Sequence, residues 1–514
     1  MLTRLKVTGF KNLVDVDVRF GPFTCIAGVN GVGKSNLFDA IMFLSALADR
    51  PLLDAAKSVR DEDGRTSDIR SLFHRVGNDF NEQMAFEVEM IVPLKGIDEL
   101  GQEAQASITS LHYAITIGYR AENGSKQGSL ELLREELTHI NIGEASKHFL
   151  FPHSAAHWRS SAVVGRRTGV AFISTEGVGK ERIIKLHADG SELTGRHGGR
   201  PRSILAVNLP RTVLSTANAA ENPTALMAKR EMQSWRMLQL EPAALRTPDD
   251  ISAPTKLGVN GANLAATLYH LTKRQLSVKQ DVCEPEEAVK AVYAQVANRL
   301  SDLIDDVKEV SVDYDEKREI LTAIVTGRDG TPHSARSLSD GTLRFLALAV
   351  LEKDTDATGV ICLEEPENGI HPERIPAMLD LLQDIATDTD EPIGPDNPLR
   401  QVIINTHSPA VVTQVPDESL LVAESIKMVR NGKQFNVVRL CPLPDTWRHN
   451  EVSEKKIEAV SKGKLLSYLN PVAPVTPEYE YGVSVRRSKV TPLKRRVVDR
   501  PDLQPYLPLV AESQ

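Results

Sequence analysis

Residues 28–35 read Gly-Val-Asn-Gly-Val-Gly-Lys-Ser and constrain the fold of this chain more than any other segment. The glycines let the backbone curl so that successive N–H groups point at phosphate oxygens, the lysine adds positive charge, and the serine hydroxyl can ligate Mg²⁺. The apolar run Phe23–Ala27 before the loop predicts a buried strand. Apolar residues at helical spacing after the loop predict a helix, at Leu37, Ile41, Leu44 and Ala48. This order of strand, loop and helix predicts an α/β fold with a phosphate-binding loop at the positive end of a helix.

We expect this loop to bind ATP with Mg²⁺. The residues that we assign to nucleotide binding are Gly28, Asn30, Gly31, Gly33, Lys34, Ser35 and Asn36. Lys34 is also assigned to catalysis, because its charge faces the β- and γ-phosphates, and Ser35 is assigned to the metal.

A second apolar run, Gly359–Leu363, predicts a buried strand that leads into Glu364 and Glu365. Two adjacent acids at the end of such a strand cost free energy unless they meet a cation. Phosphate-bound Mg²⁺ is a suitable counter-charge, with Glu364 holding the metal through water and Glu365 deprotonating the attacking water. The alternative is a solvated acidic loop after a core strand, which the upstream phosphate loop disfavours.

The composition fits a soluble globular protein. The chain has 514 residues, of which 41% are hydrophobic and 25% charged, enough for about two to four structural units. No apolar run approaches the roughly 18 residues of a membrane span, and the start shows no signal-peptide pattern, so we expect a cytoplasmic protein without membrane contact. The four cysteines lie far apart without a CxxC pair, which argues against a zinc site or a disulfide framework. The net charge of −8 excludes a chain-wide basic field, so nucleic-acid contact would require a local patch.

Three further segments bring a family into view. Ser337–Arg344, "SLSDGTLR", resembles the signature motif of ABC-type ATPase heads, and Gln401–Pro409, "QVIINTHSP", resembles their switch segment. The continuation "EEPENGIHP" from Glu364 is similar to the RecF/SMC-like and OLD-like branch of the AAA family ATPases, as are the opening "LKVTGFKNL" and the segment "NGANLAATLYHL". The resemblance covers about residues 1–48 and 255–425, with five motifs in the expected order.

This resemblance implies an ABC-type ATPase head with a P-loop mixed sheet, an antiparallel β subdomain and an inserted helical or mixed lobe. We expect residues 1–120 to form the lobe with the Walker A loop and antiparallel strands, and residues 121–330 to form the inserted lobe. Residues 331–440 carry the signature, Walker B acids and switch histidine, and residues 441–514 form a partly extended C-terminal extension.

The resemblance also implies roles for single residues. Glu364 stands at the Walker B position, where the family often has Asp, Glu365 matches the catalytic base, and His407 matches the switch histidine near the γ-phosphate. Ser339 and Gly341 match signature positions that contact nucleotide bound by a second subunit. From the residues alone, Ser339 also fits a plain helix N-cap and His407 a structural role. The family's glutamine loop has Gln83 as its nearest candidate.

The implied partners follow from what the chain resembles. Only about 105 residues follow His407, and they contain no acidic pattern typical of the Toprim domain of OLD-type nucleases. ATPases of this build without Toprim resemble the ATPase subunits of Septu-type and retron-associated antiphage systems, which pair with a nuclease. We therefore expect a slow, regulatory ATPase that forms a homodimer, or a higher oligomer of dimers, and controls a separate nuclease effector. The alternative is a RecF-like DNA-binding ATPase in recombination or repair.

The C-terminal segment contrasts in charge with the acidic chain. Seven basic residues fall within fifteen positions, at Arg486, Arg487, Lys489, Lys494, Arg495, Arg496 and Arg500. Several prolines make a packed helix unfavourable there, so we expect an extended segment. A solvated tail, a partner-docking arm and a nucleic-acid contact all remain compatible with this pattern.

Overall fold

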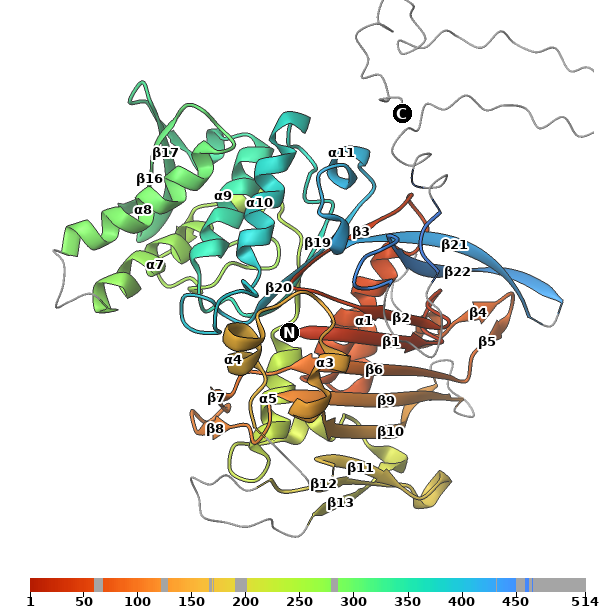
Figure 1. Cartoon of the computed structure of the whole chain (residues 1–514). Coiled ribbons are helices and arrows are strands. Elements are labelled where there is room, and N and C mark those ends of the chain that lie inside the picture. Colours follow the sequence, from red (N-terminus) through yellow and green to blue (C-terminus); the bar gives the residue numbers. More distant parts are fainter. Residues whose placement is uncertain are drawn as a thin grey trace, which may run out of the picture. The chain divides into compact units, whose positions relative to one another are not determined.

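A six-stranded sheet built around the predicted phosphate-loop strand organises the computed structural model (Figure 1). In spatial order its strands are β14 (Arg236–Leu238), β19 (Gly359–Glu364), β20 (Arg400–Thr406), β3 (Phe23–Ala27), β21 (Leu420–Arg430) and β22 (Lys433–Pro442). The first five run parallel to one another, and β22 pairs antiparallel with β21 at the edge. Because parallel strands end at a common edge, the segments after β3, β19 and β20 meet there.

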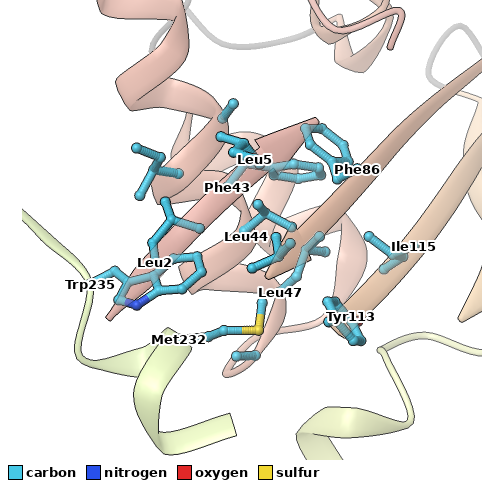
Figure 2. Close-up of a cluster of buried hydrophobic side chains, with 14 of the residues drawn as sticks. Leu2, Leu5, Phe43, Leu44, Leu47, Phe86, Tyr113, Ile115, Met232 and Trp235 are labelled. Carbon is cyan, nitrogen blue, oxygen red and sulfur yellow. The ribbon is translucent and has the colours of Figure 1, made fainter. Parts of the chain in front are cut away.

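A second, eight-stranded sheet is antiparallel throughout. In spatial order its strands are β13 (Arg202–Leu205), β12 (Ile183–Leu186), β11 (Ile173–Glu176), β10 (Ser129–His139), β9 (Ser110–Arg120), β6 (Gln83–Ile91), β1 (Leu2–Thr8) and β2 (Val16–Arg19). Helix α1 (Lys34–Leu47) packs its apolar side chains against this sheet, and Figure 2 shows Phe43, Leu44 and Leu47 among side chains of β1, β6 and β9.

Both faces of the six-stranded sheet are buried, because successive side chains of its strands point alternately into two hydrophobic cores. Val360 and Cys362 of β19 join the core formed by α1 and the eight-stranded sheet. Ile361 and Leu363 point the other way, into a core with α9 (Asp340–Lys353) and α10 (Ile375–Ile385). The continuous apolar run of this strand is therefore explained by its burial on two sides.

A helical lobe follows between β14 and helix α9, which begins at the predicted signature motif. It contains α7 (Leu264–Val278), α8 (Pro285–Ser301) and the hairpin of β16 (Val307–Asp315) with β17 (Ile320–Gly327), which also pairs with β15 (Asp249–Asp250) and β18 (Pro332–Ser334). The other short elements are α2 (Leu52–Ser58), β4 (Arg75–Val76), β5 (Asp79–Phe80), β7 (Lys95–Ile97), β8 (Glu103–Gln105), α3 (Ala145–His148), α4 (Ser160–Ala162), α5 (Pro223–Gln233), α6 (Pro242–Leu245) and α11 (Pro409–Val412).

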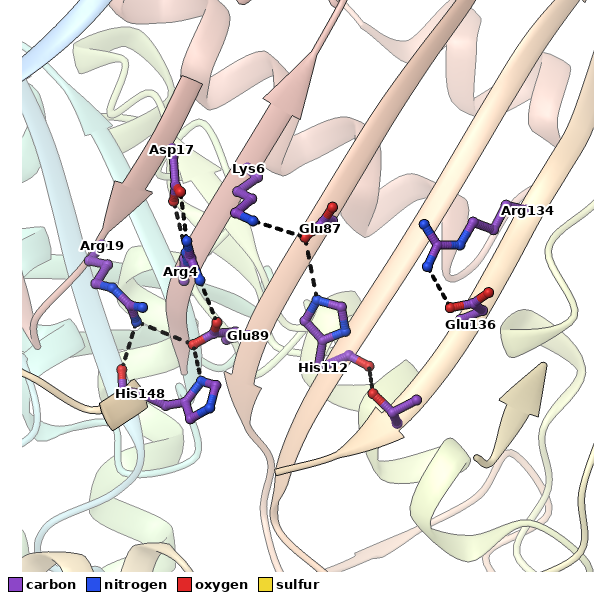
Figure 3. Close-up of polar contacts among 11 residues, drawn as sticks. Arg4, Lys6, Asp17, Arg19, Glu87, Glu89, His112, Arg134, Glu136 and His148 are labelled. Atoms are coloured by element: carbon purple, nitrogen blue, oxygen red, sulfur yellow. Dashed lines mark hydrogen bonds and ion pairs between the residues drawn. The ribbon is translucent and has the colours of Figure 1, made fainter. Parts of the chain in front are cut away.

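The face of the eight-stranded sheet opposite α1 carries charged side chains in cross-strand pairs (Figure 3). Glu89 of β6 is the centre of one group and contacts Arg4, Arg19 and His148 at 3.0, 3.2 and 2.9 Å. Burial alone would raise the pKa of Glu89, but the hydrogen bond and charge of His148, the charge of Arg19 and the hydrogen bond from Arg4 outweigh it and lower the pKa to about 2.

The structure describes residues 1–59, 68–121, 128–165, 169, 171–189, 201–278, 285–430, 432–449, 458–461 and 465. The mixed α/β fold with an antiparallel β subdomain is confirmed. The expected boundary at residue 120 differs from the structure, because β9 and β10 pair across it from Ser129–Arg120 to His139–Leu111. The antiparallel sheet therefore continues to Leu205, and the helical lobe occupies only the later part of residues 121–330.

The basic segment predicted for the C-terminus lies outside the described residues. Among the described residues, no helix has both the length and the apolar character needed to cross a bilayer.

Candidate nucleotide site

The phosphate loop joins the end of β3 to α1, as the sequence predicts. Gly31 and Gly33 adopt φ angles of 78° and 106°, in the left-handed region that glycine enters without strain. A Cβ at Gly31 would have no heavy atom within 4 Å, and Val29, Asn30 and Gly31 are exposed, so the top of the loop is open to a ligand. A Cβ at Gly33 would lie 2.1 Å from the side chain of Asn12.

Asn12 is a contact of this loop that the sequence did not indicate. Its Nδ2 donates to the carbonyl of Val32 at 3.1 Å, and its Oδ1 accepts from Asn36 Nδ2 at 2.8 Å. The backbone oxygen of Asn12 accepts from Val438 N at 3.3 Å. Asn12 thus ties the loop and the first turn of α1 to strand β22.

Lys34 lies folded back over its own loop. Its Nζ donates to the carbonyls of Gly28 and Val29 at 2.6 and 3.1 Å. Burial lowers the pKa of the Lys34 ammonium, and the nearby carboxylates of Glu365, Glu367 and Glu364 oppose that shift. The Lys34 ammonium therefore lies close enough to the predicted acids for their charges to interact.

The two predicted acids lie where β19 ends. Asn405 Nδ2 of the neighbouring strand β20 donates to Glu364 Oε1 at 3.4 Å. Glu365 has a φ of 46°, rare for a residue with a side chain, and its N–H donates to the carbonyl of Asn405 at 3.0 Å. The neighbouring strand thus holds Glu365 in a backbone conformation that costs free energy.

Glu365 contacts the predicted switch histidine directly. His407 Nδ1 lies 2.6 Å from Glu365 Oε1, and Asn368 Nδ2 donates to Glu365 Oε2 at 2.9 Å. Both oxygens of the predicted base are thus oriented, one by the residue after β20 and one by the turn after β19.

The signature residues lie at the start of α9. Ser339 caps the helix, with its Oγ accepting from Thr342 N at 3.2 Å, so the N-cap interpretation holds. A Cβ at Gly341 would lie 2.4 Å from the carbonyl of Gly369, so glycine permits the close approach of α9 to the turn after β19. In the part of the chain that the structure describes, no hydrogen bond joins Ser339 or Gly341 to the phosphate loop of the same chain.

Two more residues at this edge were not predicted. Gln239 follows β14 and lines a pocket of about 310 Å³ with Glu364, Glu365, Asn368 and Arg344. Gln83, the nearest candidate for the glutamine loop, instead begins β6 and pairs with Gly118. Glu367 lies buried near the site, with its Oε1 accepting a hydrogen bond from Thr406 Oγ1. The pairing of β14 with β19 explains why Gln239 lies beside the two predicted acids.

The donor set fits ATP with Mg²⁺. The open loop offers backbone N–H groups and one ammonium to phosphate oxygens, and the Ser35 hydroxyl and the Glu364 carboxylate are oxygen ligands of the kind that Mg²⁺ takes. Ser35 and Glu364 are each partly exposed, so both remain accessible to a ligand at the sheet edge.

A family model described as "AAA domain, putative AbiEii toxin, Type IV TA system" matches residues 23–93 and 239–413. No curated protein matches the chain.

A comparison with solved structures finds similarity to SMC heads at low sequence identity and low TM-score. The head bound to the C-terminal winged-helix domain of ScpA is 13% identical, with a TM-score of 0.42, over 86% of this chain and 98% of that one. The head domain from Thermotoga maritima is 12% identical, with a TM-score of 0.35, over 86% and 98%. A head with an extended coiled coil, bound to the C-terminal domain of ScpA and derived from Pyrococcus furiosus, is 12% identical, with a TM-score of 0.39, over 85% of this chain and 96% of that one.

The matched segments contain the phosphate loop, both acids and the switch histidine. Residues 23–93 and 239–413 are therefore similar to the AAA domain of this family model, and the chain has a mixed α/β fold with the phosphate loop between β3 and α1.

Proposed function

We propose that the chain binds ATP with Mg²⁺ at the edge of the six-stranded sheet and hydrolyses it slowly. The observation that carries this proposal is the 2.6 Å contact between Glu365 and His407 at the edge where the phosphate loop also begins. A carboxylate held by a histidine and an asparagine is suited to accept a proton from an attacking water.

Each side chain has a task in this scheme. When ATP binds, the Lys34 ammonium leaves the carbonyls of Gly28 and Val29 and donates to phosphate oxygens instead, so that its positive charge faces the negative phosphates. Ser35 and Glu364 hold the metal, and Asn405 orients Glu364. Bound Mg²⁺ neutralises charge on the phosphates. His407 and Asn368 keep Glu365 directed toward the water, so the histidine acts as an orienting group.

We infer further that two heads share two nucleotides. The phosphate loop covers a nucleotide from one side, whereas Ser339 of the same chain caps helix α9 and Gly341 lies against the turn after β19. The signature residues are thereby left to face nucleotide on a second copy, as the family resemblance implies.

Mixing two inactive variants tests this arrangement. Lys34→Ala removes the phosphate contact, and Ser339→Arg blocks the signature surface. A mixed dimer with one copy of each keeps one intact composite site, so mixing should restore up to about half of the wild-type activity per such dimer. No recovery at any ratio would contradict shared sites.

As its biological role we propose control of a separate effector, a nuclease, in antiphage defence. The words "toxin" and "TA system" in the description of the matching family support a role in a defence or growth-control system. Co-purification with the products of neighbouring genes, with and without ATP, tests this role. A nuclease retained only by the ATP-bound protein is the expected result. ATP-dependent binding of the isolated protein to gapped DNA, without an effector, would favour the RecF-like alternative.

A further inference from the structure

Glu367 is a buried acid that the proposed reaction does not use. Its surface is 7% exposed, and it lies in the turn between the catalytic Glu365 and Gly369. Its Oε1 accepts from Thr406 Oγ1, and its Oε2 has no hydrogen-bond partner among the described residues. Keeping a buried carboxylate with one oxygen unsatisfied costs free energy, so a compensating role is expected.

The hydrogen-bond directions around Thr406 are fixed by its single hydroxyl proton. Thr406 Oγ1 accepts from Ser408 N at 2.9 Å, so a lone pair of the hydroxyl is used by the backbone of the switch segment. The hydroxyl proton is then available to Glu367 Oε1. The backbone oxygen of Thr406 accepts from Gly28 N at 3.2 Å, at the first residue of the phosphate loop.

These contacts bracket His407. Thr406 precedes the histidine and Ser408 follows it, and both are held by the hydroxyl that Glu367 binds. The same threonine joins the switch segment to the phosphate loop, while Glu367 joins it to the turn that carries Glu365 and Asn368. One buried pair thus links three segments of the site.

We propose that Glu367 and Thr406 form a positioning pair that fixes His407 against Glu365. Neither residue contacts the reacting atoms in this proposal, which rests on the ATP hydrolysis proposed above. In addition, burial and the charge of Glu365 raise the pKa of Glu367, whereas the Thr406 bond and His407 oppose that shift. The carboxyl can therefore accept the threonine hydroxyl at Oε1 in either protonation state.

The matched variants are Thr406→Val, which keeps the shape and removes the hydroxyl, and Thr406→Ser, which keeps the hydroxyl. A misplaced His407–Glu365 pair should lower kcat by about tenfold or more in Thr406→Val, while KM for ATP changes less than about twofold. Thr406→Ser should stay within about threefold of the wild-type kcat.

Glu367 supplies the second half of the test. Glu367→Ala should lower kcat as Thr406→Val does, and the double variant should be no slower than the slower single variant, because both changes break one link. Glu367→Gln keeps an oxygen for the hydroxyl and should retain more activity than Glu367→Ala. Thermal unfolding of each variant separates lost positioning from lost folding, since a Thr406→Val protein with wild-type Tm and low kcat supports positioning.

Two outcomes are distinguishable. A wild-type protein without ATPase activity overturns the proposed function, and the positioning role with it. An active wild type whose Thr406→Val variant keeps its kcat, or in which the two changes add fully, overturns the positioning role alone.

Discussion

Glu89 in the eight-stranded sheet and Glu367 beside the six-stranded sheet are about equally hidden from solvent, with 3% and 7% of their surfaces exposed. Glu89 is surrounded by Arg4, Arg19 and His148, and its pKa falls to about 2. Glu367 has one hydroxyl donor and a neighbouring acid, and its pKa rises. A buried glutamate therefore stabilises the eight-stranded sheet through ion pairs, whereas a buried glutamate beside the six-stranded sheet has few hydrogen-bond donors and no ion pair among the described contacts.

Glu135 shows a third environment, inside the eight-stranded sheet. It has no surface exposed and accepts from Val213 N, Leu214 N and Tyr113 Oη at 2.7, 2.8 and 3.1 Å. Burial raises its pKa to about 7, which these three hydrogen bonds oppose. The antiparallel sheet thus satisfies its buried acids with cations or donors, whereas the parallel sheet gathers three acids at one edge, as expected where a ligand supplies the missing positive charge.

Lys34→Ala should give the largest effect at the edge of the parallel sheet. Removing an ammonium about 4 Å from a phosphate at a partly screened site costs about 4 kcal/mol, or about a thousandfold in ATP affinity. Isothermal titration with ATP and Mg²⁺ measures the loss. Lys57→Ala, an exposed lysine on α2, is the matched control and should bind as the wild type does. Equal ATP affinity of the Lys34 variant and the control would show that the loop does not bind the nucleotide.

Glu135 should make the antiparallel sheet sensitive to neutral pH. Its pKa in the folded protein, about 7, lies above the ordinary value of 4.5, so the folded state binds more protons between these values. Its contribution to the free energy of unfolding is full below pH 4.5 and falls by about 3 kcal/mol as the pH rises through 7. Glu135→Gln cannot titrate at this position. The free energy of unfolding of the variant, relative to that of the wild type, should therefore rise by this amount between pH 4.5 and pH 8. A pH-independent difference in urea unfolding would contradict the assignment.

Glu89 should show the opposite sign at acidic pH. Its folded pKa of about 2 lies below 4.5, so its stabilisation is present above pH 4.5 and is lost as the pH falls toward 2. Between pH 5 and pH 3 the wild type should lose about 2 kcal/mol more than Glu89→Gln. Glu87→Gln, at the half-exposed acid on the same face, keeps Glu89 and serves as control, so it should still lose the stability that Glu89→Gln does not lose. Parallel pH curves for wild type and Glu89→Gln would show that the ion pairs contribute nothing.

The parts of the site that the sequence predicts are those whose backbone geometry is encoded locally. Gly31 and Gly33 permit the loop between β3 and α1, and the apolar run of β19 places Glu364 and Glu365 at its end. The assignment of His407 to the site followed from the family resemblance alone, and its contact with Glu365 was not predicted, because 42 residues separate the two and no local pattern joins them.

The remaining parts depend on which strands become neighbours. Gln239 belongs to the site because the three-residue strand β14 pairs with β19, and three residues give too little periodicity to predict a strand. Asn12 and Glu367 act through contacts to segments 20 or more residues away. The boundary at residue 120 differed for the same reason, since β10–β13 carry weak local patterns and gain their place by pairing with β9 and with one another.

Glu365→Gln tests the central claim, that the edge of the parallel sheet is a site of ATP hydrolysis, most directly. The substitution removes the proton acceptor and keeps the size of the side chain, so ATP should still bind while kcat falls by about a hundredfold or more. Asp380→Asn, at an exposed acid of α10, is the matched control and should keep the wild-type kcat. Steady-state phosphate release, measured beside ATP binding, gives both quantities. Retained binding with lost turnover is the predicted result, and a Glu365→Gln protein that hydrolyses ATP at the wild-type rate would contradict the account.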